Sequence, residues 1–117
     1  MMLPGRSLVV AAAVLYSSAA AAHAMLEHAH PSAGAVLHQS PATLQLQFSE
    51  QLEPLFSGAT VTDPRGQSAA AGAATIQGTT ITVPLKPLPA GAYRVRWHAV
   101  SVDTHRTEGS YAFTVAP

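Results

Sequence analysis

Two side chains near the C-terminus, Asp103 and His105, lie two positions apart, and their types could serve a metal ion or an acid–base pair. If the backbone between them is extended, both point to the same side, which presents a carboxylate and an imidazole together. An Asp-x-His pair in a loop is also commonly no more than a solvated, hydrogen-bonded pair. The role of this pair therefore depends on what the fold brings beside it.

The first residues of the chain are typical of a secretory signal peptide. They contain one cation, Arg6, followed by an apolar run at residues 8–15 and a stretch of small residues. The apolar run is shorter than the roughly 20 residues that a helix needs to cross a membrane. We therefore expect residues 1–22 to be removed as a signal peptide. The mature, periplasmic domain is then residues 23–117, with no membrane insertion.

Two cleavage positions satisfy the preference for small residues, and they predict different chemistry. Cleavage after Ala22 leaves His23 first, so that its α-amine and its imidazole could chelate one ion without help from the fold. Cleavage after Ala24 leaves Met25 first and removes that chelate. With the first cut, His23 could join Asp103 and His105 as metal ligands.

The donor atoms available limit the choice of metal. The chain has no cysteine, so no thiolate can bind a metal and no disulfide supports the exported fold. Three nitrogens from His23 and His105 with one oxygen from Asp103 suit the tetragonal geometry of Cu(II), which also heads the affinity order of divalent ions. We expect one Cu(II) ion, with zinc as the second choice.

Net charge and motifs exclude several classes of function. The chain has six basic and six acidic residues, and loss of Arg6 leaves a small acidic excess, so no nucleic-acid partner is indicated. No G-x-S-x-G elbow, phosphate-binding loop or HExxH motif is present, which argues against the common hydrolases.

Four further histidines need an interpretation. His28 and His30 lie two apart near the mature N-terminus and could share a face, either as an auxiliary metal site or as exposed imidazoles on an opening strand. His38 lies in a turn, and His98 alternates with arginines, so we expect both at the surface.

Hydropathy patterns predict short strands and no helix. Residues 43–48 alternate between apolar and polar side chains, and residues 93–99 and 111–115 do the same with aromatic residues on one face. Shorter strands are expected at 59–62 and in a hairpin around Gly78. About seven strands with nine prolines favour an all-β, immunoglobulin-like sandwich with Trp97 in its core.

Four ordered motifs make the sequence resemble the CopC family of periplasmic copper-resistance proteins over essentially the whole mature chain. They are His23-Ala24-Met25-Leu26, Pro31-Ser32-Ala33-Gly34-Ala35, Phe48-Ser49-Glu50, and the block at 93–105 followed by Gly109-Ser110-Tyr111. The resemblance implies a Greek-key β-sandwich and a Cu(II) site made of His23, Asp103 and His105. It also implies a carrier or buffer role in copper resistance or homeostasis, acting as a monomer and not as an enzyme, with a CopD-type inner-membrane transporter as the receiving partner.

Three positions qualify this resemblance. Glu50 matches a family glutamate near the site. Two interpretations of its carboxylate are equally open: it is a solvated group at the end of a strand, or it is a weak or indirect partner of the metal. Some members carry a Cu(I) site built from methionines, whereas the mature chain keeps only Met25, so we expect no Cu(I) site. Arg106 replaces the proline that many members have after the site histidine.

Two other functions remain as alternatives. An N-terminal histidine that binds copper with a second imidazole also occurs in lytic polysaccharide monooxygenases, so a copper redox enzyme is one. Asp103 argues against it, because an anionic ligand disfavours Cu(I) and occupies a position that oxygen needs. The other is a metal-free sandwich that serves as an interaction module.

Overall fold

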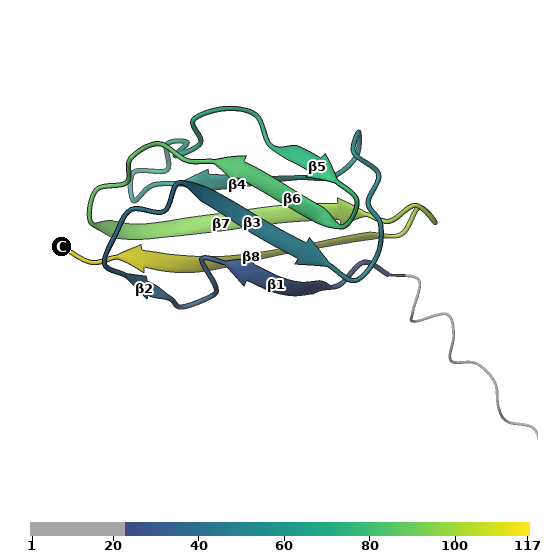
Figure 1. Cartoon of the computed structure of the whole chain (residues 1–117), viewed down its shortest axis with the longest axis horizontal. Helices are drawn as coiled ribbons and strands as arrows, with labels where there is room; N and C mark the ends of the chain where they lie inside the picture. The colour runs from purple at the N-terminus through teal and green to yellow at the C-terminus, as the bar shows by residue number, and fades with distance from the viewer. Residues whose placement is uncertain (1–22) are drawn as a thin grey trace, which may run out of the picture.

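The computed structural model describes residues 23–117, so the expected signal peptide lies outside the described residues. The described chain forms eight strands in two four-stranded sheets that face each other (Figure 1). The predicted all-β sandwich is confirmed, with eight strands where about seven were expected. Successive strands mostly cross from one sheet to the other, as in a Greek key, and two hairpins interrupt this pattern. No helix among residues 23–117 is long and apolar enough to cross a membrane.

The first sheet contains the strand with the clearest alternating pattern. In β3, Leu44, Leu46 and Phe48 are buried and the glutamines between them are exposed, so the predicted strand and its inward face are confirmed. All strand pairs of this sheet are antiparallel, in the order β1 (Leu26–His30), β3 (Thr43–Phe48), β6 (Thr80–Pro84) and β5 (Thr75–Gln77).

The second sheet is built around one long hairpin. Its strands each have ten residues and pair from Gly91 opposite Val115 to Val100 opposite Arg106. The strand not predicted from the sequence is the two-residue β2, which is too short to show alternation and pairs parallel with β8. The order in this sheet is β2 (Val36–Leu37), β8 (Arg106–Val115), β7 (Gly91–Val100) and β4 (Gly58–Thr62).

Aromatic side chains fill the space between the sheets. Tyr93 and Phe113 are buried and stack with ring centroids 5.6 Å apart. Phe48 of the first sheet meets Trp97 of the second edge to face at 5.1 Å. Trp97 is only partly buried, because it lies at the margin of the core and not in its centre. Each fully buried ring contributes about 1.5–3 kcal/mol of hydrophobic stabilisation.

The topology brings distant segments to one end of the sandwich. The β7–β8 turn lies at the right-hand end of Figure 1, where the chain also enters β1. Residues at the start of the described chain therefore lie beside residues 101–105.

Candidate metal centre

A tight turn at residues 101–105 joins β7 to β8 and carries two of the candidate ligands. The Ser101 amide donates to the His105 carbonyl at 2.9 Å, and the Thr104 amide donates to the Ser101 carbonyl at 2.8 Å. Thr104 has a φ of +76°, in the left-handed region. The expectation of an extended backbone here is wrong. The turn nevertheless brings Asp103 Oδ2 to 3.2 Å from His105 Nδ1.

Hydrogen bonds hold the Asp103 carboxylate in its charged form. Its Oδ1 accepts from the Ser101 hydroxyl, and more weakly from the His105 amide at 3.4 Å. The Ser101 hydroxyl, followed by the His105 backbone and ring, lowers the pKa of Asp103 below its ordinary value. Asp103 is therefore available as an anionic ligand.

Residues 23–25 are held across the ends of β3 and β8 by hydrogen bonds on two sides. On the β3 side the Ser49 amide donates to the Met25 carbonyl at 2.9 Å. The Met25 amide donates to Ser49 Oγ at 2.9 Å, and Ser49 Oγ donates to the His23 carbonyl at 3.3 Å. On the other side, Thr107 Oγ1 donates to the Ala24 carbonyl at 2.7 Å. Ala24 itself is fully buried, so this segment is anchored in the core as well as by hydrogen bonds.

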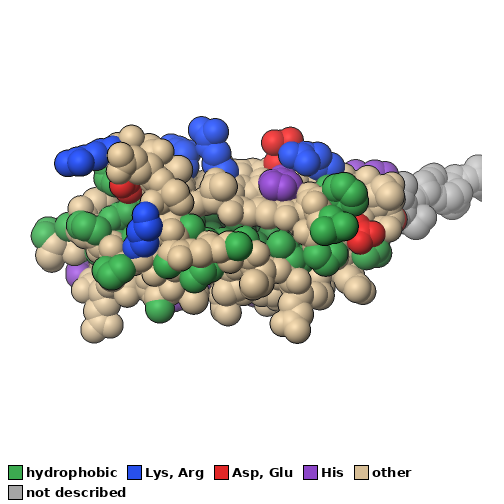
Figure 2. Space-filling model, turned by 90° about the horizontal axis from the view of Figure 1, so that it is seen from above, with side chains coloured by type: hydrophobic (Ala, Val, Ile, Leu, Met, Phe, Trp, Pro, Cys, Tyr) green, Lys and Arg blue, Asp and Glu red, His purple; other side chains and the backbone are tan. Residues whose placement is uncertain are grey.

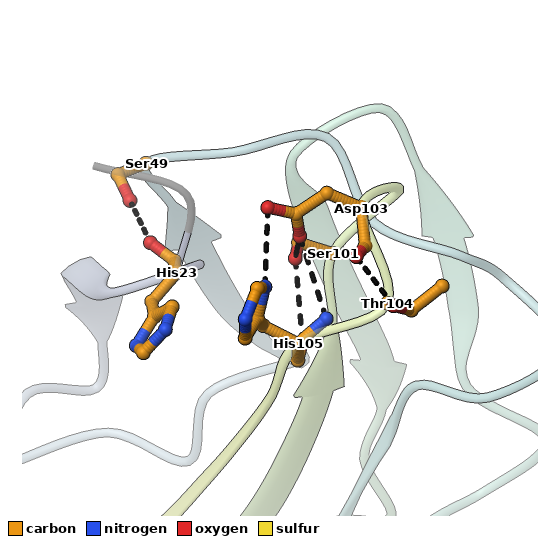
Figure 3. A network of polar contacts seen from close by, with 6 residues as sticks. All are labelled: His23, Ser49, Ser101, Asp103, Thr104 and His105. Atoms are coloured by element: carbon orange, nitrogen blue, oxygen red, sulfur yellow. Dashed lines mark hydrogen bonds and ion pairs between the residues drawn. The ribbon is translucent and has the colours of Figure 1, made fainter. Parts of the chain in front are cut away.

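The anchored segment places the His23 ring against the His105 ring. Their centroids lie 4.5 Å apart with a tilt of 34° between the planes, and Figure 3 shows the two rings facing each other beside Asp103. The three predicted ligands thus meet at one end of the sandwich. Their side chains are open to solvent, with exposed fractions of 52% for His105 and 39% for Asp103.

These groups could close on one ion with small movements. Two neighbouring ligands in a square-planar site with bonds near 2.0 Å stand about 2.8 Å apart, not far from the 3.2 Å between Asp103 Oδ2 and His105 Nδ1. Among residues 23–117, no three His, Asp, Glu or Cys side chains already stand in a metal-binding arrangement. In the full-length chain the His23 nitrogen is part of a peptide bond with Ala22, so cleavage between them must supply the amine.

The other candidate residues lie outside this group. Glu50 is half-buried directly after Ser49, and at this end of β3 the hydrogen bonds to residues 23–25 within the described chain come from Ser49. His28 and His30 are exposed on β1. His38 is exposed, as predicted.

His98 departs from the expectation of a surface side chain. It is half-buried, because its ring packs over Gly58, where an added Cβ would come within 3.2 Å of His98 Cε1. The β4–β7 pairing that places Gly58 opposite His98 explains this burial.

Three hydroxyl side chains that build the site were not identified from the sequence. Ser49 and Ser101 stand inside the motifs that carry the family resemblance, which is the signal that could have found them. Thr107 belongs to no such motif, and only the fold shows its contact with Ala24.

A larger hollow formed by the described residues lies elsewhere. It has a volume of about 760 Å³ and lies between the turn at residues 63–66 and the segment 86–90, at the start of β7. It contains no histidine. A metal ion needs converging ligands and no large cavity, so we place the candidate site at the His23 end.

Comparisons with known proteins match the chain to one family and one fold. The model of the CopC domain matches residues 26–116. Copper resistance protein C of Escherichia coli is 42% identical over 106 residues, which cover 82% of this chain and 83% of that protein. The crystal structure of CopC from Methylosinus trichosporium OB3b has a TM-score of 0.74 and 33% identity, covering 81% of this chain and 95% of its own. PcoC, a methionine-rich copper resistance protein from Escherichia coli, has a TM-score of 0.71 and 37% identity, covering 80% and 99%.

Proposed function

This chain belongs to the CopC family, whose members are copper-binding copper resistance proteins and not enzymes, and from that premise we propose that its mature form, residues 23–117, holds one Cu(II) ion in the periplasm. The ligands are the α-amine and ring of His23, the carboxylate of Asp103 and the ring of His105. One observation carries the proposal: the His23 and His105 rings lie 4.5 Å apart although the two residues come from opposite ends of the mature chain.

The donor set favours Cu(II) over Cu(I). Cu(I) prefers soft sulfur ligands, and Met25 is the only methionine after residue 22, whereas the similar PcoC is described as methionine rich. Imidazole, amine and carboxylate donors suit Cu(II), and an ionised Asp103 stabilises the higher charge. This set is suited to holding Cu(II), and not to cycling it between oxidation states.

The exposure of the site supports a role in carrying or buffering copper. Because Asp103 and His105 lie at the surface, a receiving protein could reach the ion without unfolding the domain. The family resemblance suggests a CopD-type inner-membrane transporter as that receiver. The domain acts as a monomer in this proposal, since all the ligands come from one chain.

The test is the intact mass of the protein exported by a bacterial host, measured with and without one equivalent of Cu(II). We expect a chain that begins at His23 and holds one copper, and the variants His23→Ala and His105→Ala should each weaken binding by more than about tenfold. The matched control, His38→Ala, should bind as the wild type does. A chain that begins at Met25, or unchanged binding by both ligand variants, would refute the proposal.

A further inference from the structure

A second group of histidines lies on the outer face of the first sheet. His28 and His30 line a shallow hollow of about 250 Å³, and none of His23, Asp103 and His105 takes part in it. The remaining residues around the hollow are Ala29, Gln45, Gln47 and Thr80. The hollow is therefore separate from the copper site proposed above.

A β-bulge at the start of β1 turns both histidines outward. Leu26 packs against the core, and in a regular strand His28 and His30 would point to the same side as Leu26. The register shifts between Leu26 and His28, so one extra residue, Glu27, is inserted there. After the shift Ala29 faces the core, while His28 and His30 are exposed. The bulge creates a pair of imidazoles on one face.

The strand geometry brings the two imidazoles within reach of one ion. Residues two apart in a strand are about 6.6 Å apart, and both side chains stand on the same side. An imidazole is long enough for ring nitrogens at this spacing to converge on an ion with bonds of about 2.0–2.1 Å. Across the strand pair, His28 lies opposite Gln47 and His30 opposite Gln45, so amide oxygens are available as further ligands.

The charge around the hollow favours a cation. Within the described chain, β1, β3, β5 and β6 contain no Lys or Arg, and their only charged residue is Glu27, beside His28. The arginines Arg94, Arg96 and Arg106 belong to the second sheet. Figure 2 shows most of the Lys and Arg side chains along one long edge of the molecule. A divalent ion can therefore approach His28 and His30 without a neighbouring positive charge.

We propose that His28 and His30 form a second, weaker and exchangeable site for a borderline divalent cation, Cu(II) or Zn(II). Two imidazoles supply the protein ligands, and glutamine oxygen and water complete the coordination. The site is weaker than the first because it lacks both a carboxylate ligand and the chelating terminal amine. It does not depend on the first site, since it needs no signal-peptide cleavage at a particular residue.

The experiment is a titration of the folded domain with Cu(II) and, separately, with Zn(II), followed by competition with a chelator and by NMR. We expect a second equivalent of Cu(II) to broaden the amide signals of His28, His30, Gln45 and Gln47. Zn(II) should shift the same signals without broadening them.

The double variant His28→Ala/His30→Ala should lose this second equivalent and keep the first, with the NMR spectrum otherwise unchanged, because both side chains are exposed. The matched control His38→Ala should keep both equivalents. In the His23→Ala background the signals of the hollow should still respond, which separates this proposal from the first. Retention of the second equivalent by the double variant, or no response of these signals to either ion, would overturn the proposal.

Discussion

Replacing Ser49 by alanine should weaken copper binding although Ser49 is no ligand. Its hydroxyl accepts from the Met25 amide at 2.9 Å and donates to the His23 carbonyl at 3.3 Å. Together with the main-chain bond from the Ser49 amide to the Met25 carbonyl, which the variant keeps, these contacts hold the N-terminal segment against the end of β3. Without the hydroxyl, His23 is held less firmly, so part of its ordering takes place when the ion binds, and this ordering costs free energy.

The size of the effect follows from the two hydrogen bonds. A neutral hydrogen bond contributes a net of about 0.5–1.5 kcal/mol, and both bonds here lie in contact with water, which favours the low end of that range. The longer bond is the weaker of the two. Together they are worth about 1 kcal/mol, so the affinity for Cu(II) should fall roughly fivefold.

The assay is competition with a chromophoric Cu(II) chelator, using protein that begins at His23. The matched control is Ser110→Ala, an exposed serine on β8, which should leave the affinity unchanged. Adding Thr107→Val to Ser49→Ala removes the bond to the Ala24 carbonyl as well and should weaken binding further. An affinity within the error of the wild type for both variants would show that the N-terminal segment is not positioned by these contacts.

Three more perturbations test the turn, the core margin and the alkaline stability. Gly109→Ala would place a Cβ 2.6 Å from Trp97 Cζ2, so we expect a loss of about 1–3 kcal/mol in the free energy of unfolding, measured by urea denaturation; an unchanged midpoint would contradict the packing described. Thr104 has a φ of +76°, which costs a β-branched residue about 1–2 kcal/mol. Thr104→Gly should therefore raise the unfolding free energy by about 0.5–1 kcal/mol after the entropy cost of glycine, and a lower thermal midpoint would argue against strain at this residue. Burial raises the pKa of Tyr111 to about 12. The unfolded chain releases this proton near pH 10 while the folded chain keeps it. The contribution of Tyr111 to stability should therefore be constant below that pH, and stability should fall as pH rises from about 10 to 12. Tyr111→Phe should decline less steeply over this interval, and identical declines would refute the assignment.

The parts of the fold that the sequence predicted are those where one face of a strand is buried. In β3 the leucines alternate with glutamines, and in β7 Tyr93 and Val95 alternate with arginines, so burial leaves a visible period of two. The first half of β8 has no such signal. Its residues 106–110 are polar or glycine, and they form a strand because β7 pairs with them along its full length.

The β-bulge in β1 could not be predicted either, because it depends on pairing between strands and leaves no pattern in the sequence. The bulge between Leu26 and His28 depends on how β1 must pair with β3 while Leu26 stays inside. The sequence could suggest that His28 and His30 share a face. It could not show that a register shift makes this face the outer one.

In the candidate site, too, the residue types could be predicted from the sequence, but the contacts that position them could not. Residue type and spacing predicted that Asp103 and His105 lie together, and the structure confirms this. The expected extended backbone is wrong, because a turn with a left-handed Thr104 brings them together. His23 was predicted as a ligand from its position after the expected signal peptide. What places it beside His105 is a set of contacts from Ser49 and Thr107, and these depend on strands that are far apart in the sequence.

The role of the N-terminal amine can be tested by comparing Cu(II) binding by two forms of the domain that differ by one residue. One form begins at His23, and the other begins at Ala22, so its His23 nitrogen is an amide and cannot chelate. We expect tight binding of one Cu(II) by the first form and a large loss of affinity in the second, with the same fold by NMR. Equal affinity for the two forms would contradict a site built on the N-terminal histidine.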